Sequence, residues 1–274
     1  MIWKEMGVMT EQNPKIERYP DAEERRRIMD LIMAAGETLL ENGAEVFRVQ
    51  QTMESMARSL HLREFHAYVL TNGIMASAGT AEIGEVRNVP SRTVHLGRVA
   101  GVNELSHKLA EGKISVAEAE IALVNIRNIP FRNTKVCVLA GAAGAFSFAV
   151  MFGGGPAEGA SAALSALLMQ CFIIVCRRAH TGELFRRMAA AAFITAFCTV
   201  FCGLWGGDRN IASIGALMLL TPGVSLTMGI QDFVHGDYLS GMIRVLDAIL
   251  VAACLAIGTG AVMMFLERFT GGAA

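Results

Sequence analysis

Residues 188–206 read MAAAAFITAFCTVFCGLWG, a run of 19 residues without one charged side chain. At about 1.5 Å per residue, a helix of this length covers about 28 Å, close to the about 30 Å of a bilayer's hydrocarbon core. The run therefore predicts a transmembrane helix, and it decides the class of fold for the second half of the chain.

Four more apolar stretches of the same half are long enough to span a bilayer. They lie at about 136–154, 159–176, 211–230 and 238–266, and the last is free of charge only from Ala248 to Leu266. Glycine and alanine dominate the spans before residue 206, and small residues let helices approach closely in lipid. The pattern predicts an all-α polytopic bundle of about five transmembrane helices, not a set of membrane anchors.

Charge is divided unevenly along the 274 residues. Only 18% of the chain is charged, and residues 1–135 hold 17 of the 24 lysines and arginines and 18 of the 25 acidic residues. A polar domain therefore precedes a membrane domain, which excludes a fully soluble protein. The formal net charge of −1 gives no electrostatic basis for binding nucleic acid.

Basic residues collect on one side of the predicted spans. Arg132 and Lys135 precede the first span, and residues 177–187, between the second and third, hold four arginines. Residues 153–158, between the first and second, hold none. Since basic residues favour cytoplasmic loops, we predict a multi-pass protein of the cell inner membrane with its N-terminal domain cytoplasmic and its C-terminus external.

The polar half predicts an α+β cytosolic domain at 21–130, between a tail at 1–20 that lacks the apolar core of a signal peptide and a transmembrane domain at 131–270. Helical periodicity over 21–60, interrupted at Gly43, predicts two helices. Short runs separated by turn residues predict antiparallel strands; they lie at 67–70, 73–77, 85–87 and 93–96. Helices are expected at 102–111 and 115–127, and the latter opens with a capping-box pattern, Ser115 to Glu118.

This domain carries none of the sequence motifs of a serine-hydrolase nucleophile, a zinc protease, a P-loop or a dinucleotide-binding fold. Its four histidines lack metal-ligand spacing, and the six cysteines of the chain form no CxxC pair. We therefore expect no enzyme activity, no metal and no cofactor.

The stretch around Pro222 and Gly223 differs from the other apolar runs. Proline removes a backbone hydrogen bond, and such breaks are tolerated at membrane depth where the freed groups face protein or a watery cavity. Interrupted helices commonly form the substrate sites of transporters. A plain proline kink is the alternative.

Three charged residues follow this break. Arg244 and Asp247 share one face of a helix and can pair, and Asp232 precedes them. Within a membrane such groups are costly, which makes them candidates for function: an arginine suits a carboxylate, and an aspartate suits an ammonium group or a coupling proton. The alternative is that all three anchor the protein at the membrane interface.

Two stretches resemble the threonine/serine exporter (ThrE) family. Leu39-Leu-Glu-Asn-Gly-Ala-Glu-Val-Phe-Arg-Val49, together with Val69-Leu-Thr-Asn-Gly-Ile-Met-Ala-Ser77, is similar to the family's N-terminal domain. The more specific match is to a late membrane motif; its members are Pro222, Gly223, Asp232, Gly236, Asp237, Gly241 and Arg244. Where family members often have Arg-Val-Glu, this chain has Arg48-Val-Gln50, which leaves Glu45 or Thr52 as a partner of Arg48 within the helix.

The resemblance implies a subunit of a secondary transporter that exports small carboxylate metabolites, either threonine and serine or a succinate-like dicarboxylate. Domain order and size are similar to the YjjP type, in which a small membrane protein of the YjjB type supplies further spans. An odd number of spans also suits half of an inverted-repeat transporter, so we expect either a YjjB-like partner or a homo-oligomer.

Six residues are thus candidates for binding substrate or ion: Pro222, Gly223, Asp232, Asp237, Arg244 and Asp247. Gly43, Glu45 and Arg48 form a motif of the N-terminal domain, unless they only shape the turn between two helices. Two other functions stay open: a membrane-anchored enzyme, and a sensor or assembly subunit whose cytosolic domain regulates a separate pore.

Overall fold

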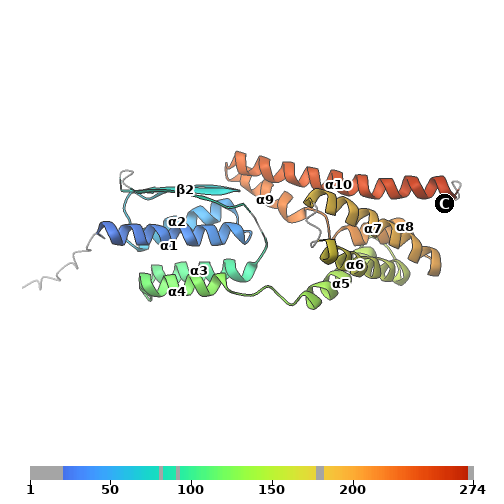
Figure 1. Ribbon diagram of the computed structural model, residues 1–274, viewed down its shortest axis with the longest axis horizontal. Coiled ribbons are helices and arrows are strands. Elements are labelled where there is room, and N and C mark those ends of the chain that lie inside the picture. Colours follow the sequence, from blue (N-terminus) through green and yellow to red (C-terminus); the bar gives the residue numbers. More distant parts are fainter. Residues whose placement is uncertain (1–20, 80–82, 91–92, 177–181, 271–274) are drawn as a thin grey trace, which may run out of the picture. The chain divides into compact units, whose positions relative to one another are not determined.

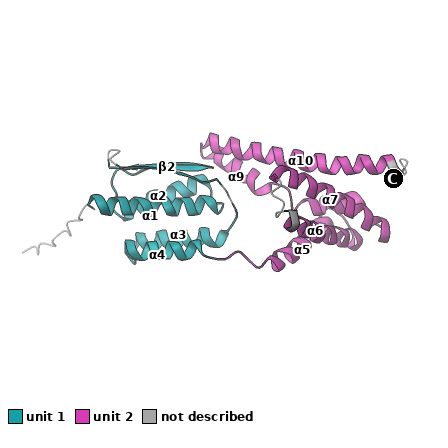
Figure 2. Cartoon of the chain, in the orientation of Figure 1, with its two compact units in different colours: residues 1–129 teal, residues 130–274 magenta. Residues whose placement is uncertain are grey.

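The computed structural model divides the chain into two compact units, an N-terminal unit of residues 1–129 and a C-terminal unit of residues 130–274 (Figures 1 and 2). It describes residues 21–79, 83–90, 93–176 and 182–270. Each unit is described by itself below.

The N-terminal unit packs helices against one side of a small antiparallel sheet. Strands β1 (His66–Leu70), β2 (Gly73–Ala78) and β3 (Ile83–Asn88) pair in sequence order. The inner face of the sheet, which includes Val69 and Ile74, is buried in the core. Its helices are α1 (Ala22–Glu41), α2 (Val46–Ser59), α3 (Leu96–Ala110) and α4 (Val116–Arg127).

The turn between α1 and α2 depends on Gly43, as its position in the sequence predicts. Gly43 has φ of +88°, and a Cβ atom there would lie 3.1 Å from the backbone oxygen of Thr93. A side chain would therefore meet both the strain of the left-handed region and a fixed backbone atom. At the other end of the unit, Ser115 and Glu118 form the predicted capping box of α4.

The predicted strand at 93–96 is wrong. The backbone N–H groups of Thr93 and His95 donate to the backbone oxygens of Glu41 and Asn42, at the C-terminal end of α1. The His95 side chain then caps α3, which begins at Leu96. This segment therefore closes the open end of α1, whose last carbonyls lack helical partners, and adds no strand to the sheet.

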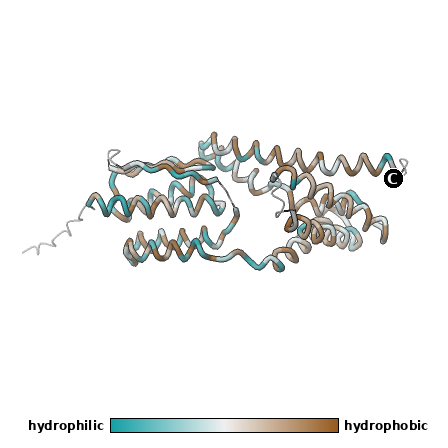
Figure 3. Tube along the Cα trace, in the orientation of Figure 1, coloured by the Kyte–Doolittle hydropathy of each residue, from teal (hydrophilic) through white to brown (hydrophobic). Residues whose placement is uncertain are grey.

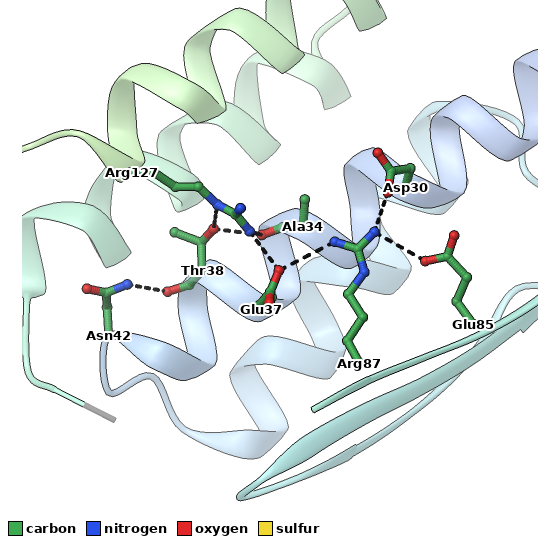
Figure 4. A network of polar contacts seen from close by, with 8 residues as sticks. All are labelled: Asp30, Ala34, Glu37, Thr38, Asn42, Glu85, Arg87 and Arg127. Carbon is green, nitrogen blue, oxygen red and sulfur yellow. Dashed lines mark hydrogen bonds and ion pairs between the residues drawn. The ribbon is translucent and has the colours of Figure 1, made fainter. Parts of the chain in front are cut away.

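A network of arginines and carboxylates joins three elements of this unit (Figure 4). Arg127 of α4 donates to Thr38 Oγ1 at 2.7 Å, to the backbone oxygen of Ala34 at 2.9 Å and to Glu37 Oε2 at 2.9 Å. Arg87 of β3 also contacts Glu37, and it pairs with two further carboxylates; these are Asp30 and Glu85. The network ties α4 and the sheet to α1.

The carboxylates of this region repel one another in part. Burial, and then the charge of Glu37, raises the pKa of Glu41, while the charges of Arg127 and Arg98 oppose that rise. Arg127 therefore both donates hydrogen bonds and offsets negative charge.

Replacing Arg127 with alanine is expected to lower the free energy of unfolding of the N-terminal unit by about 1–2 kcal/mol at neutral pH. The loss should shrink as the pH falls and the carboxyl of Glu41, whose pKa is raised by burial, takes up a proton, because the charge of Arg127 then offsets less negative charge. Hydrogen exchange of α1 and α4 in the full chain at pH 7.5 and pH 4.5 measures this. Arg26→Ala, on the exposed face of α1, is the control; an equal loss there would contradict the assignment.

The described residues of the C-terminal unit form six helices, and Figure 3 shows how strongly apolar they are. They are α5 (Thr134–Met151), α6 (Pro156–Cys176), α7 (Glu183–Trp205), α8 (Arg209–Leu217), α9 (Gly223–Val234) and α10 (Tyr238–Thr270). Among the described residues, four of them, α5, α6, α7 and α10, are long and apolar enough to cross a membrane.

The predicted span at 211–230 is not one helix. It is divided between α8 and α9, of 9 and 12 residues, and neither approaches the about 20 residues that a span requires. Of the basic cluster at 177–187, residues 177–181 lie outside the described part of the chain. Arg186 and Arg187 stand near the start of α7, where Arg187 pairs with Glu183 at 2.7 Å.

Small side chains form the core of α5 to α8. Among the described residues, seven alanines of this core are fully buried; they are Ala145, Ala149, Ala162, Ala166, Ala190, Ala212 and Ala216. Gly215 of α8 lies so close to α5 that a Cβ there would stand 2.6 Å from the backbone nitrogen of Ala149. Close approach through small residues is how helices pack in lipid, and it matches the glycine and alanine content of the sequence.

Candidate functional site

The interruption between α8 and α9 lies at the Pro222–Gly223 step. Just after α8, the backbone N–H groups of Leu219 and Leu220 donate to the backbone oxygens of Ala216 and Leu217, three residues earlier. The Thr221 hydroxyl donates to the backbone oxygen of Met218 at 2.7 Å, which satisfies a carbonyl that the helix leaves open. Pro222 then precedes the first residue of α9, a place where proline's missing N–H costs nothing.

After this break, α9 and α10 form a helical hairpin: the chain reverses direction in a tight turn, and the two helices pack against each other. The turn is closed by Gly236, with φ of +88°, and by the backbone N–H of Asp237, which donates to the backbone oxygen of Asp232 at 2.9 Å. The two helices cross at a pair of glycines: a Cβ at Gly241 would lie 2.9 Å from the backbone oxygen of Gly229. Only glycine at the crossing permits this approach.

The crossing brings Arg244 and Asp232 together in a buried ion pair. Arg244 Nε lies 3.0 Å from Asp232 Oδ2, and the two side chains are 8% and 2% exposed. The Nε–H does not point at that oxygen, so the contact is an ion pair without a hydrogen bond between those two atoms. The charges attract, but their geometry falls short of the aligned, two-bond contact that arginine and carboxylate can form.

The other nitrogens of the guanidinium group have weak partners or none. Nη1 lies 3.3 Å from the sulfur of Met228, a poor acceptor. Nη2 is buried and makes no hydrogen bond with any described residue. A buried donor without an acceptor costs about 1–3 kcal/mol, and an incoming carboxylate would supply the missing acceptor. This unsatisfied donor makes Arg244 a candidate for contact with a small anionic group.

The six candidate residues occupy different environments in the structure. Arg244 and Asp232 meet, as described. Asp247 is exposed and forms no ion pair with Arg244, so the pairing expected from their helical spacing is not made. Asp237 is half-buried in the turn, where its backbone oxygen accepts from Gly241 N–H at 2.9 Å. Pro222 and Gly223 form the break between α8 and α9, and their role is to set the backbone conformation there.

Sequence reasoning missed Met228 and Gly229, and it named Gly241 only as a member of the family motif. A repeated pattern could have revealed the two glycines: Gly229-Ile-Gln-Asp232 and Gly241-Met-Ile-Arg244 each place a glycine three residues before a charge. Antiparallel helices run in opposite directions from such a crossing, so the pattern alone does not bring the two charges together. Arg244 lies against Gly229, where a Cβ would be 3.2 Å from its own Cβ, and its long side chain reaches Asp232 from there.

In the N-terminal unit, the motif residues do not form a comparable site. Arg48 is exposed and donates to Gln51 Oε1 at 3.3 Å, and its backbone oxygen accepts from Thr52. Glu45 precedes the first residue of α2 without capping it through its side chain. Across the described residues, no group of three or more histidine, cysteine, aspartate or glutamate side chains is placed to hold a metal ion.

Comparison with known proteins identifies a family and a curated relative. Residues 30–266 match the model of the family described as "Putative threonine/serine exporter". A "Probable threonine/serine exporter" of Mycobacterium tuberculosis is 24% identical over 238 residues, which cover 85% of this chain and 45% of that protein. The matched region thus spans about half the length of the relative. No solved structure matches the chain.

Proposed function

Because the chain belongs to the threonine/serine exporter family, whose members are transporters, we propose that it exports small carboxylate-bearing metabolites across the cell inner membrane and binds them at Arg244. The observation that carries this proposal is the buried guanidinium group, which is held near Asp232 and Met228 while its Nη2 lacks a hydrogen bond to any described residue.

Arg244 would bind the substrate's carboxylate. A guanidinium group presents N–H donors in a plane that fits the two oxygens of a carboxylate. Contacts in a site that is only 8% exposed gain strength from the low local dielectric. The helix break at Pro222–Gly223 would let α9 move relative to α8, so that the site opens to one side of the membrane at a time.

The charge of the site favours an amino acid over a dicarboxylate. Arg244 and Asp232 together contribute one positive and one negative charge. The ammonium and carboxylate groups of serine or threonine complement these two charges, whereas the second carboxylate of a succinate-like molecule would face Asp232. We therefore propose threonine and serine as the preferred substrates, and succinate as a poor one.

Coupling to protons would fall to Asp232. Its carboxylate would hold either the substrate's ammonium group or a proton, so substrate and proton would exchange at this residue. Asp247 is exposed in this chain and is the weaker candidate.

The complete exporter would contain a second membrane component. The matched region is about half the length of the Mycobacterium tuberculosis relative, which is compatible with a transporter divided over two subunits. We propose a small YjjB-like membrane subunit as the partner, and a homo-oligomer of this chain as the alternative.

Efflux from cells loaded with labelled serine, threonine or succinate tests the proposal. The chain is expressed alone and together with a small membrane subunit of the YjjB type. Loss of labelled serine and threonine, but not of succinate, supports the proposed substrate class, and dependence on the second subunit identifies a divided exporter. No efflux of any label from either strain, with membrane insertion verified, would refute the proposal.

A further inference from the structure

The N-terminal unit contains a cavity that the proposed transport site does not use. Its volume is about 490 Å³, within the range of small-molecule sites, about 300–1,000 Å³. It lies between the last turns of α2, the connection that follows, and the start of β1. The polar residues that line it are Glu54, Arg58, His61, Arg63, Glu64 and His66.

Nitrogen-bearing side chains outnumber carboxylates around this cavity. Two arginines, two histidines and two glutamates line it, so with neutral histidines the formal charge is zero while N–H donors are in excess, and Glu54 already accepts a hydrogen bond from Gln50 at 3.0 Å. Arg58 forms no ion pair with any residue of the described ranges. Its guanidinium group is therefore available to a ligand at the edge of the cavity.

The connection between α2 and β1, which carries several of these side chains, is anchored to the hydrophobic core of the unit. Leu62 is 4% exposed and belongs to the hydrophobic core, and Phe65 packs against that core. His61 and Glu64 have φ of 54° and 53°, a left-handed conformation that few residues other than glycine adopt. Such backbone conformations persist where the surroundings enforce them, and they cluster at ligand sites.

We propose that this cavity binds a small multivalent anion, a metabolite that carries phosphate groups or several carboxylates. Arginine recognises both groups through paired N–H donors, and the imidazole of His66 supplies a further donor. The volume admits a molecule larger than serine or threonine, and the N–H donors at its edge suit a ligand with more anionic groups than the amino acid proposed for transport. The cavity is thus a second binding site, in the N-terminal unit.

Binding of pyrophosphate and of citrate to the purified full-length protein in detergent tests this inference. Isothermal titration at fixed ionic strength should show saturable binding of at least one of them. Pyrophosphate alone would identify a phosphate site, citrate alone a polycarboxylate site, and either result supports the proposal. Binding of neither would overturn it.

Two substitutions, one that removes a positive charge and one that removes a negative charge, test whether the anion binds in this cavity. Arg58→Gln should weaken binding about tenfold, because a charge-assisted hydrogen bond is lost, and Glu54→Gln should tighten it, because a negative charge beside the anion is removed. Arg26→Gln, an exposed arginine of α1 outside the cavity, should leave affinity unchanged. Equal affinities in wild type, Arg58→Gln and Glu54→Gln would place binding elsewhere and refute the inference.

Discussion

Replacing Arg244 with glutamine is expected to lower serine efflux by about 100-fold. Removing one partner of a buried charge pair costs about 2–5 kcal/mol, and each 1.4 kcal/mol is a factor of about ten. Arg244→Lys keeps the charge but not the planar pair of donors, so it should restore only a small part of the activity. Efflux of labelled serine from loaded cells, normalised to the amount of inserted protein, measures both variants.

Arg244→Gln alone leaves the carboxylate of Asp232 buried beside a neutral residue, which destabilises the fold as well as the site. The double variant Asp232→Asn with Arg244→Gln separates these effects, because it removes both charges together. It should regain the thermal stability of the wild type and still export almost nothing. Normal export by the double variant would show that the ion pair only holds α9 to α10, and it would remove Arg244 from the proposed mechanism.

The division of the chain could be predicted from sequence because it depends on composition over long stretches. Charge is concentrated before residue 136, and the apolar runs after it are as long as a bilayer is thick. The helices of the N-terminal unit follow from the 3.6-residue period of their apolar residues, and the start of α4 follows from its capping box. These features act over short distances along the chain.

The errors arise where distant segments decide the outcome. Residues 93–96 have the composition of a strand. The backbone N–H groups of Thr93 and His95 instead donate hydrogen bonds to carbonyl oxygens at the end of α1, about 50 residues earlier. Arg244 was expected to pair with Asp247 on its own helix, and it pairs instead with Asp232 of α9. Local spacing cannot reveal that choice, because it depends on a turn at Gly236 and on a crossing at Gly229 and Gly241.

Replacing Gly258 with alanine is expected to separate α10 from α7 and to destabilise the C-terminal unit by about 1–3 kcal/mol or more. A Cβ at this position would lie 2.2 Å from the backbone oxygen of Met188. Because that oxygen belongs to a helix backbone, no side-chain rotation can relieve the clash, and the two helices must move apart. Gly260→Ala is the matched control: it lies two residues further along α10 and has no atom within 4 Å of the added Cβ.

Thermal unfolding of both variants in the same detergent should show a lower Tm for Gly258→Ala and no decrease for Gly260→Ala. Gly258 lies 14 residues beyond Arg244, about 21 Å along the helix, so any loss of export should follow the loss of folded protein and not a change in substrate affinity. An unchanged Tm for Gly258→Ala would mean that α7 and α10 are not in contact at this glycine. Since α10 carries Arg244 and packs on α7, that result would also remove the support that holds the proposed site against the rest of the unit.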